Sequence, residues 1–230
     1  MSHEIQSIAQ RYLRRSNIPS YKYSLLNPAV NVAYQERHSA LIKLFSSIGI
    51  DHYLFPHLKF LEVGCGYGTN LLELLQLGAT PENLVGNELL EDRLVSARRR
   101  LPEAIRLLPG DAAQLSLPDA SFDVVYQSTV FSSILDDGLQ VSLAQKMWEL
   151  TRRGILWYDF VYDNPSNPDV RGVPVRRIKE LFPEGQIAFK KVTLAPPIAR
   201  RAVPVHPALY NVLNLFPFLR THTLCFINKA

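Results

Sequence analysis

A short apolar run that leads directly into three closely spaced glycines constrains this chain more than any other feature. Residues 60–63 form the run, Gly64, Gly66 and Gly68 stand at alternate positions, and a leucine-rich helical pattern begins at Thr69. Glycine adopts positive φ and lets a ligand approach bare backbone. The helix start presents free N–H groups and a partial positive charge. The order strand, glycine turn, helix therefore predicts a site for a polar or nucleotide-like ligand.

Downstream of this turn, apolar runs and helical patterns alternate. Strands are predicted at 59–63, 84–87, 105–108, 122–127 and 155–160, and helices at 69–77, 91–101, 137–151 and 174–182. One apolar run per strand with a helix after it predicts a parallel sheet covered on both faces. The end departs from this rhythm, with strands expected at 187–194 and 221–227, a proline-rich segment at 196–207 and a helix at 207–216. Residues 195–201 are expected to form an exposed linker, and the alternative is a clamp for an anionic acceptor.

Two helices are expected before the first strand. One ends near Arg15, and the second spans 30–48 and stops at Gly49. Tyr34 and Arg37 lie about one helical turn apart and share a face. We expect a solvated arginine over a packed aromatic ring here, with a cofactor contact as the alternative.

Composition narrows the class of protein. The chain has 230 residues with 47% hydrophobic and 20% charged, which is typical of one globular domain with an appendage. A net charge of +4 with scattered basic doublets does not predict a nucleic-acid partner. Cys65 and Cys225 lack metal-ligand spacing, so no metal site is expected, and the chain is expected to be a reduced, cytoplasmic protein. No apolar window is long enough for a membrane span.

Two kinds of nucleotide site compete for the glycine turn. Nicotinamide-dinucleotide folds carry Gly-x-Gly-x-x-Gly or Ala, whereas here the third glycine comes one residue early and Thr69 takes the expected position. Glu62 adds a carboxylate two residues before the first glycine. The string Glu-x-Gly-x-Gly-x-Gly resembles motif I of the class I S-adenosylmethionine (SAM)-dependent methyltransferases. The resemblance implies that Glu62 orders the loop and the ammonium of SAM. The loop residues assigned to SAM on this basis are Gly64, Cys65, Gly66 and Gly68.

Residues at the ends of the next two strands extend the resemblance. Glu88, with Leu89 beside it, lies 20 residues beyond Gly68, the spacing at which an acid binds ribose hydroxyls. Asp111 and Ala112 follow the third strand. The resemblance implies that Asp111 accepts a hydrogen bond from the adenine amino group.

The fourth strand ends in Gln127 and Ser128. It resembles the strand whose end faces the methyl sulfonium, so we expect both residues to line the site. The string Tyr-Gln-Ser-Thr at 126–129 departs from the N/D-P-P-Y motif of DNA and amide N-methyltransferases, which argues against that activity.

The resemblance also implies the architecture. We expect a seven-stranded, mostly parallel, doubly wound α/β sheet with an antiparallel edge strand. Residues 1–57 would form an N-terminal helical cap or lid, and residues 58–230 the SAM-binding methyltransferase domain. The acceptor pocket would be built from lid segments near 1–40 and 195–220.

A hydroxyl acceptor needs a group that takes its proton. The candidates are Asp159 near the end of the fifth strand, His206 in the proline-rich segment and His222 at the start of the last strand. The alternative for each histidine is a buried structural role, and for Asp159 a cap or turn acid.

The sequence therefore predicts a SAM-dependent methyltransferase that acts on a small-molecule or saccharide acceptor. The saccharide would be a glycan-linked acceptor. Oxygen is the expected methyl acceptor and nitrogen the alternative. Two other functions stay open, a non-catalytic SAM- or nucleotide-binding partner subunit and a nicotinamide-dependent oxidoreductase. Nothing in the sequence predicts the oligomeric state.

Overall fold

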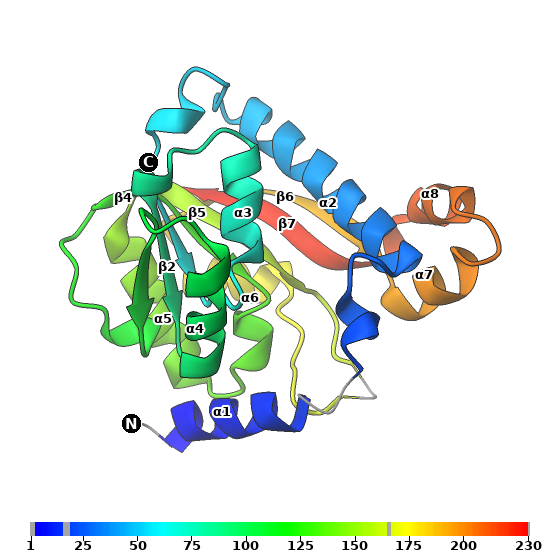
Figure 1. The fold of residues 1–230 in the computed structure, drawn as a ribbon, viewed down its shortest axis with the longest axis horizontal. Helices are drawn as coiled ribbons and strands as arrows, with labels where there is room; N and C mark the ends of the chain where they lie inside the picture. Colours follow the sequence, from blue (N-terminus) through cyan, green and yellow to red (C-terminus); the bar gives the residue numbers. More distant parts are fainter. Residues whose placement is uncertain (1–2, 16–18, 165–166, 230) are drawn as a thin grey trace.

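The computed structural model contains a seven-stranded sheet in the order β3-β2-β1-β4-β5-β7-β6 (Figure 1). The structure describes residues 3–15, 19–164 and 167–229, so the remaining positions of the predicted cap and domain lie outside the described residues. The strands are β1 (Phe60–Val63), β2 (Leu84–Glu88), β3 (Arg106–Pro109), β4 (Phe122–Ser128), β5 (Thr151–Phe160), β6 (Gln186–Leu194) and β7 (Arg220–Asn228).

The strand directions confirm the predicted fold class. β1 to β5 pair in parallel, and β7 runs antiparallel to both of its neighbours, β5 and β6. One detail differs from the prediction, because the antiparallel strand lies one position inside the edge and β6 is outermost. Lys190 is exposed and Lys191 half-buried on this edge strand, where charged side chains oppose edge-to-edge pairing.

Helices cover both faces of the sheet, as predicted. α5 and α6 pack on one face in a first apolar core, and α2, α3 and α4 pack on the other face in a second core. All four residues of β1 are buried, which is expected of a central parallel strand between two helical layers. The helices are α1 (His3–Arg15), α2 (Pro28–Ser47), α3 (Thr69–Gln76), α4 (Glu91–Arg100), α5 (Asp137–Leu150), α6 (Val175–Leu181), α7 (Pro196–Ala202) and α8 (Ala208–Asn214).

β5 begins at Thr151, four residues before the predicted start at 155. Arg152 and Arg153 interrupt the apolar pattern, although both belong to the strand and are exposed. Gly154 lies so close to β7 that a Cβ there would come within 2.4 Å of the Ile227 carbonyl oxygen. The ladder with β4 reaches Thr151, which pairs with Phe122, and this pairing, which the apolar pattern does not encode, extends the strand.

The proline-rich segment is not the exposed linker that the sequence predicts for residues 195–201. Its first part is helix α7, which begins at a proline, a residue that suits the first helical turn. Ala199 and Val203 are buried in a third apolar cluster together with Ala29 of α2 and Tyr210 of α8. The segment therefore packs against the start of α2 and contributes to the core.

Arg37 is buried, so the prediction of a solvated arginine is wrong. Its Nη2 donates to Glu73 Oε2 at 2.6 Å, and its Nη1 donates to the Tyr126 hydroxyl at 3.0 Å. Glu73 also contacts the Nδ1 of His38 at 2.8 Å. The guanidinium carbon lies 5.5 Å from the ring centroid of Tyr34, its neighbour on the same helix face. Arg37 joins α2 to α3 and β4 through paired charges in the apolar layer.

The described residues contain no group of three or more His, Cys, Asp or Glu side chains that could hold a metal ion. Cys65 and Cys225 are both free and buried. No helix in the described ranges has the length and apolarity needed to cross a bilayer.

Replacing Arg37 with methionine will destabilise the fold by about 3–5 kcal/mol, because it leaves the Glu73 carboxylate buried without its cation. Urea unfolding of R37M and the wild type measures the difference. The matched control is R176M, which removes an exposed arginine that pairs with Glu180 on the surface of α6 and should leave the unfolding midpoint close to that of the wild type. Equal midpoints for R37M and R176M would contradict the prediction.

Candidate cofactor site

A pocket of about 250 Å³ opens at the carboxyl ends of β1, β2, β3 and β4. Ligands of open parallel α/β sheets bind at this edge. The pocket lining includes eight of the residues assigned to SAM from the sequence, Gly64, Cys65, Gly66, Glu88, Leu89, Asp111, Ala112 and Ser128. The other three, Glu62, Gly68 and Gln127, are not among the lining residues in the described part of the chain.

The glycine loop after β1 adopts a backbone that other residues rarely take. Gly64, Gly66 and Gly68 have φ values of +66°, +56° and +78°. A Cβ on Gly64 would lie 2.6 Å from Cγ2 of Val130, whereas a Cβ on Gly66 would meet nothing within 4 Å. Gly66 therefore presents bare backbone to the pocket, and Gly68 is the N-cap of α3.

Glu88 connects the ends of β1 and β2. Its Oε2 accepts a hydrogen bond from the Gly66 amide at 2.8 Å, and its Oε1 accepts one from the Leu90 amide at 2.9 Å. The side chain is buried and still lines the pocket. Because each carboxylate oxygen accepts more than one hydrogen bond, Glu88 both fixes the glycine loop and retains acceptor capacity toward a ligand hydroxyl.

The loop after β3 is held by two polar side chains. Asp111 accepts a hydrogen bond from the Ala113 amide at 3.0 Å, which caps a short 3-10 turn. The Asn87 side chain donates to the carbonyls of Leu108 and Gly110 at 3.2 and 3.0 Å. Asn87 lines the pocket, and the sequence analysis did not assign it a role, although an amide inside an apolar strand was a signal.

Glu62 lies behind the glycine loop and is completely buried. Its Oε1 accepts from the Asn70 side chain at 2.6 Å, and its Oε2 has no hydrogen-bond partner among the described residues. Burial raises the pKa of this carboxyl to about 8. Asn70 itself lines the pocket, so Glu62 acts on the site through its hydrogen bond to Asn70.

The turn after β4 contains a strained residue. Thr129 has a φ of +58°, which is rare for a β-branched residue, and its amide donates to the Tyr158 carbonyl at 2.8 Å. Gln127, which was expected in the lining, instead accepts a hydrogen bond from the Val130 amide at 3.1 Å and so stabilises this turn. Thr129 and Val130 are pocket residues that the sequence analysis missed. Such strain is typical of functional turns that the surrounding structure holds in place.

Helix α1 forms one wall of the pocket. Ile5, Ile8 and Tyr12 line it, and the Tyr12 hydroxyl donates to Ser133 Oγ at 3.2 Å. The Arg11 guanidinium donates to the Ser133 carbonyl at 3.2 Å. These contacts bridge residues more than 120 positions apart, so local sequence patterns gave no signal for them.

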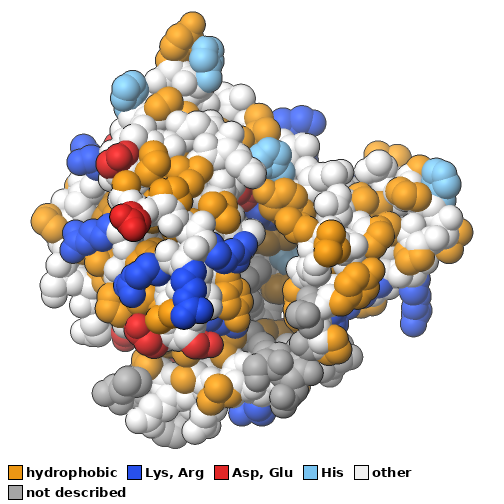
Figure 2. Space-filling view, viewed as in Figure 1, with side chains coloured by type: hydrophobic (Ala, Val, Ile, Leu, Met, Phe, Trp, Pro, Cys, Tyr) orange, Lys and Arg blue, Asp and Glu red, His pale blue; other side chains and the backbone are white. Residues whose placement is uncertain are grey.

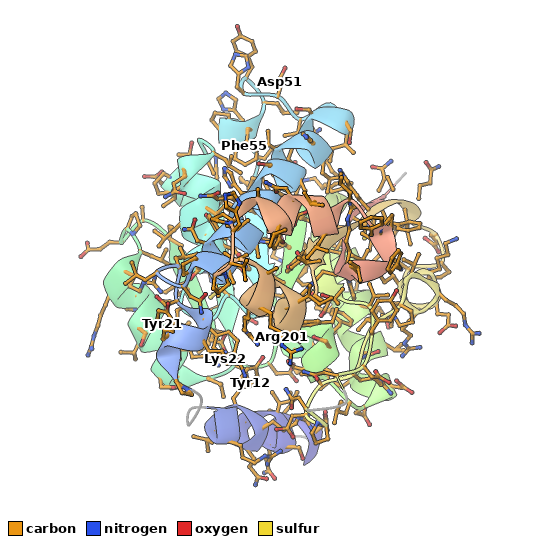
Figure 3. The ribbon with its side chains drawn as sticks, turned by 90° about the vertical axis from the view of Figure 1, so that its right-hand side faces the viewer. Tyr12, Tyr21, Lys22, Asp51, Phe55 and Arg201 are labelled. Carbon is orange, nitrogen blue, oxygen red and sulfur yellow. The ribbon has the colours of Figure 1, made fainter. Side chains whose placement is uncertain are left out.

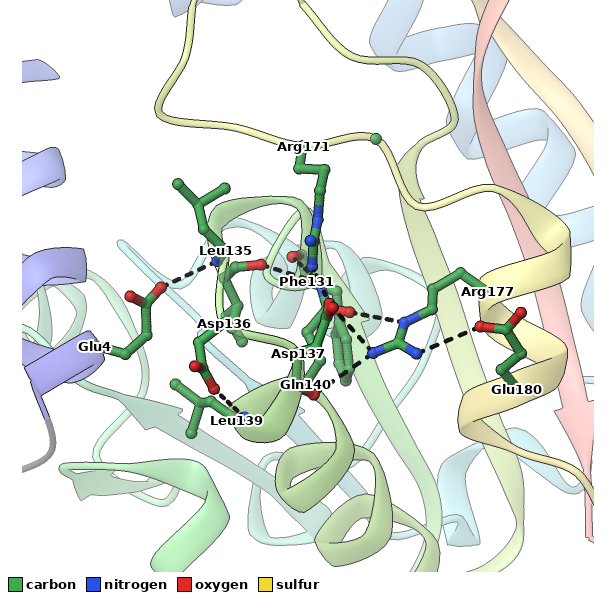
Figure 4. Close-up of polar contacts among 12 residues, drawn as sticks. Glu4, Phe131, Leu135, Asp136, Asp137, Leu139, Gln140, Arg171, Arg177 and Glu180 are labelled. Atoms are coloured by element: carbon green, nitrogen blue, oxygen red, sulfur yellow. Dashed lines mark hydrogen bonds and ion pairs between the residues drawn. The ribbon is translucent and has the colours of Figure 1, made fainter.

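The turn that receives α1 is itself braced by side chains from α5 and α6 (Figure 4). Glu4 accepts from the Leu135 amide at 3.0 Å. Gln140 donates to the Phe131 carbonyl at 3.1 Å, and Arg177 donates to the Gln140 side-chain oxygen at 3.1 Å. The wall opposite the glycine loop is therefore fixed from three helices.

Arg93 of α4 lines the pocket between two aromatic rings. Its guanidinium carbon lies 4.1 Å from the ring centroid of Tyr12 and 5.3 Å from that of Tyr67. Tyr12 comes from α1 and Tyr67 from the glycine loop. Arg93 therefore connects the helical wall to the loop that it faces.

The lining fits an extended nucleoside with an amino-acid tail. Bare glycine backbone lies at one part of the pocket, Glu88 offers a carboxylate suited to ribose hydroxyls, and Asp111 offers a second acceptor beside apolar α1 side chains. These are the roles that the resemblance implies for the same residues.

Asp159 lies at the end of β5 and is completely buried. Its two oxygens accept from the amides of Ser132 at 3.1 Å and Phe160 at 2.8 Å. Burial raises its pKa to about 6. Asp159 is not among the pocket-lining residues in the described part of the chain, and this geometry matches the alternative of a turn acid.

The two candidate histidines have different surroundings. His222 is buried, stacks on Tyr158 with 4.8 Å between ring centroids, and contacts Thr221 Oγ1 through Nδ1 at 3.1 Å. Burial and the nearby Arg37 lower its pKa to about 3, so the ring is neutral at physiological pH. His206 is exposed, and its Nδ1 accepts from the Ala208 amide at 3.2 Å at the start of α8.

Comparison with protein families gives a match to the central segment of the chain. Residues 60–154, which run from β1 into β5, match a family model described as "Methyltransferase domain". This segment contains the glycine loop, Glu88 and Asp111. A search of curated proteins finds no match to the chain.

Several solved structures with the same fold are named as methyltransferases. The magnesium protoporphyrin IX methyltransferase of Synechocystis PCC 6803 with bound S-adenosylhomocysteine shares 15% identity at a TM-score of 0.60, over 96% of this chain and 94% of that chain. A possible histamine N-methyltransferase from Thermotoga maritima shares 16% at 0.58, over 100% of both chains. A methyltransferase from Archaeoglobus fulgidus shares 15% at 0.58, over 85% of this chain and 96% of that chain. At these identities the likeness establishes the fold.

Replacing Glu88 with alanine will weaken SAM binding by about 10- to 100-fold, because the variant loses the charged acceptor that holds Gly66 and faces the pocket. Isothermal titration calorimetry measures the affinity. The matched control is E91A, since Glu91 is an exposed acid in the first turn of α4. Equal affinities for E88A and E91A would contradict the prediction.

The neutral state of His222 makes stability depend on pH. The folded protein keeps the ring neutral down to about pH 3, whereas the unfolded chain binds a proton below about pH 6.5. The stabilisation from this residue is therefore complete above about pH 6.5 and is lost as the pH falls. Between about pH 7.5 and pH 5 the unfolding free energy should shift in favour of H222F by about 2 kcal/mol relative to the wild type.

Urea unfolding of H222F and the wild type at both pH values tests this shift. Phenylalanine keeps an aromatic ring against Tyr158 and removes the titrating group. The control is H206F, at an exposed histidine, which should keep the pH dependence of the wild type. An H222F curve parallel to that of the wild type would contradict the argument.

Proposed function

Because the chain combines a methyltransferase domain over residues 60–154 with the class I SAM-dependent fold, we infer that it transfers a methyl group from SAM to a hydroxyl oxygen of a small-molecule or glycan-linked acceptor. SAM is the cofactor, as the sequence analysis predicted. The observation that carries the inference is the hydrogen bond between Glu88 and the Gly66 amide, which joins the acid after β2 to the glycine loop within one pocket.

The chain's own residues position the cofactor. Backbone at Gly66 accommodates the amino-acid end, with Asn70 and the buried Glu62 beneath it. Glu88 accepts hydrogen bonds from ribose hydroxyls, and Asp111 accepts one at the base. When bound, SAM supplies a methyl group already activated by its sulfonium, so alignment and exclusion of water are the main tasks left to the protein.

We place the acceptor over the ends of β4, β5 and β7. Ser128 lines the pocket and pairs with Tyr158 in the sheet register, and Tyr158 stacks on His222. The Tyr158 hydroxyl hydrogen-bonds to Thr193 Oγ1 at 2.9 Å, and Thr193 is a second β-branched residue with positive φ, at +64°. A neutral imidazole and hydroxyl groups in this corner support a hydroxyl acceptor, although a pKa of about 3 makes His222 a weak proton acceptor.

The proposed acceptor is a small molecule or saccharide and not a nucleic acid. The net charge of +4 and the sequence Tyr-Gln-Ser-Thr at the end of β4 support this choice. Two structural neighbours are named for magnesium protoporphyrin IX and, as a possible substrate, histamine, two chemically unrelated compounds, so the shared fold does not select among acceptors. We also propose a cytoplasmic location, which two free and buried thiols support.

Two measurements test the proposal in order. Calorimetry with SAM and S-adenosylhomocysteine should detect binding of both, and E88A should bind both more weakly. Incubation with SAM carrying a carbon-13 methyl group and fractions of saccharides, hydroxylated small molecules and amines should then label a product. The carbon-13 chemical shift distinguishes a methyl ether or ester from an N-methyl group.

The outcomes separate the parts of the proposal. A labelled O-methyl product supports it in full, and an N-methyl product overturns the choice of oxygen. Cofactor binding with no labelled product in any fraction would favour the non-catalytic partner subunit. Absence of SAM binding would overturn the proposal as a whole.

A further inference from the structure

Charge is distributed unevenly along this chain. Residues 185–230 contain six lysines and arginines and no aspartate or glutamate, although the whole chain has 21 acidic residues. Residues 5–35 likewise contain three arginines and one lysine with no acidic residue. The net charge of only +4 therefore conceals two strongly basic segments.

The first basic segment exposes large apolar side chains. α7, α8 and the chain up to Leu219 extend from the body of the molecule as an arm (Figure 1). Hydrophobic side chains gather on this arm, with lysine or arginine side chains at its edge (Figure 2). Phe216 and Phe218 have ring centroids 5.7 Å apart. The exposed apolar side chains here are Val205 (77% exposed), Val212 (53%), Leu215 (71%), Phe216 (46%) and Phe218 (73%).

The second basic segment supplies a neighbouring apolar surface. Between residues 20 and 26 its large exposed apolar side chains are Tyr21 (58%), Tyr23 (63%), Leu25 (45%) and Leu26 (86%). This segment leads directly into α2, whose first turns pack on α7 in the third apolar cluster. Tyr21, Lys22 and Arg201 lie on the same side of the molecule (Figure 3). Residues 20–26 and 200–218 together are called the arm face below.

We propose that the arm face binds the surface of an anionic membrane. Apolar side chains that enter the headgroup region, with basic side chains around them, are the combination by which proteins dock on a bilayer without crossing it. Each lysine or arginine near an anionic leaflet adds attraction, and the arm face carries Lys22, Arg200 and Arg201. Residues 20–26 and 200–218 contain no aspartate or glutamate that would oppose this attraction. Scattered exposed apolar residues need no partner, but a neighbouring set of this size indicates an interaction surface.

Other occupants fit the arm face less well. Two copies of this chain would bring two acid-free basic surfaces together, which like-charge repulsion opposes. Nucleic acid would pair with the basic side chains, but its phosphates and bases would not bury the exposed leucine and valine side chains. A membrane surface satisfies both the charge and the apolar side chains.

Co-sedimentation of the full chain with vesicles tests the proposal. We expect binding to vesicles of phosphatidylglycerol and phosphatidylcholine, weak binding to phosphatidylcholine alone, and a decrease as salt is raised. F216S/F218S should lower the partition coefficient at least about tenfold. K22Q/R201Q should lower it about fivefold for each charge removed.

Matched controls separate this surface from general stickiness. Y53S removes another exposed aromatic, next to Asp51 at a part of the molecule far from Arg201 in Figure 3, and R98Q/R99Q removes two exposed charges of α4. Both control variants should bind vesicles like the wild type. Calorimetry with SAM checks that all four variants remain folded. The vesicle assay itself does not require that the methyl acceptor is known.

Several results would overturn the proposal. These are absence of binding to either kind of vesicle, full binding by F216S/F218S, and equal losses in the control variants. A dimer that F216S/F218S dissociates, in the absence of vesicle binding, would instead assign the arm face to a second copy of the chain.

Discussion

The hydrogen bond from the Gly66 amide to Glu88 holds together the edge of the sheet on which the rest of the site depends. It requires left-handed backbone in the loop, which glycine adopts without strain, and a carboxylate at the end of the neighbouring strand. Because β1 and β2 are parallel and adjacent, both groups arrive at the same edge. The loop then opens α3 and makes room for Val130 on the opposite wall, so its conformation determines the shape of the pocket.

The parts of the structure that follow from local pattern could be read from the sequence. Strand, turn and helix alternate with one period, so the fold class and the strand-end positions of Glu88 and Asp111 were predictable. Local pattern failed where a distant partner decides the conformation. β5 starts early because β4 pairs with its first residue, α7 forms because it packs on α2, and Arg37 is buried because Glu73 receives its charge.

The same distinction explains which site residues were missed. Asn87, Thr129 and Val130 immediately follow or end predicted strands, and a closer reading of polar and strained positions could have found them. The contribution of α1 could not be found in this way, because Tyr12 and Arg11 contact Ser133 across more than 120 residues. No motif links the two segments, and only the folded chain brings them together.

The cofactor end and the acceptor end of the site are therefore built by different means. Loops that directly follow parallel strands form the first, and their short-range geometry fits one kind of nucleoside. The second, as proposed, would lie where β5, β6 and β7 meet α2, a corner in which the buried side chains of Tyr158, Thr193 and His222 come from distant segments. Backbone strain at Thr129 and Thr193 lies on either side of Tyr158, and strain of this kind persists only where the surrounding structure imposes it. The energy stored there indicates that this corner is shaped for a task beyond packing. In the proposed reaction a weak proton acceptor such as His222 would suffice, because a hydroxyl group becomes more acidic as its oxygen is methylated.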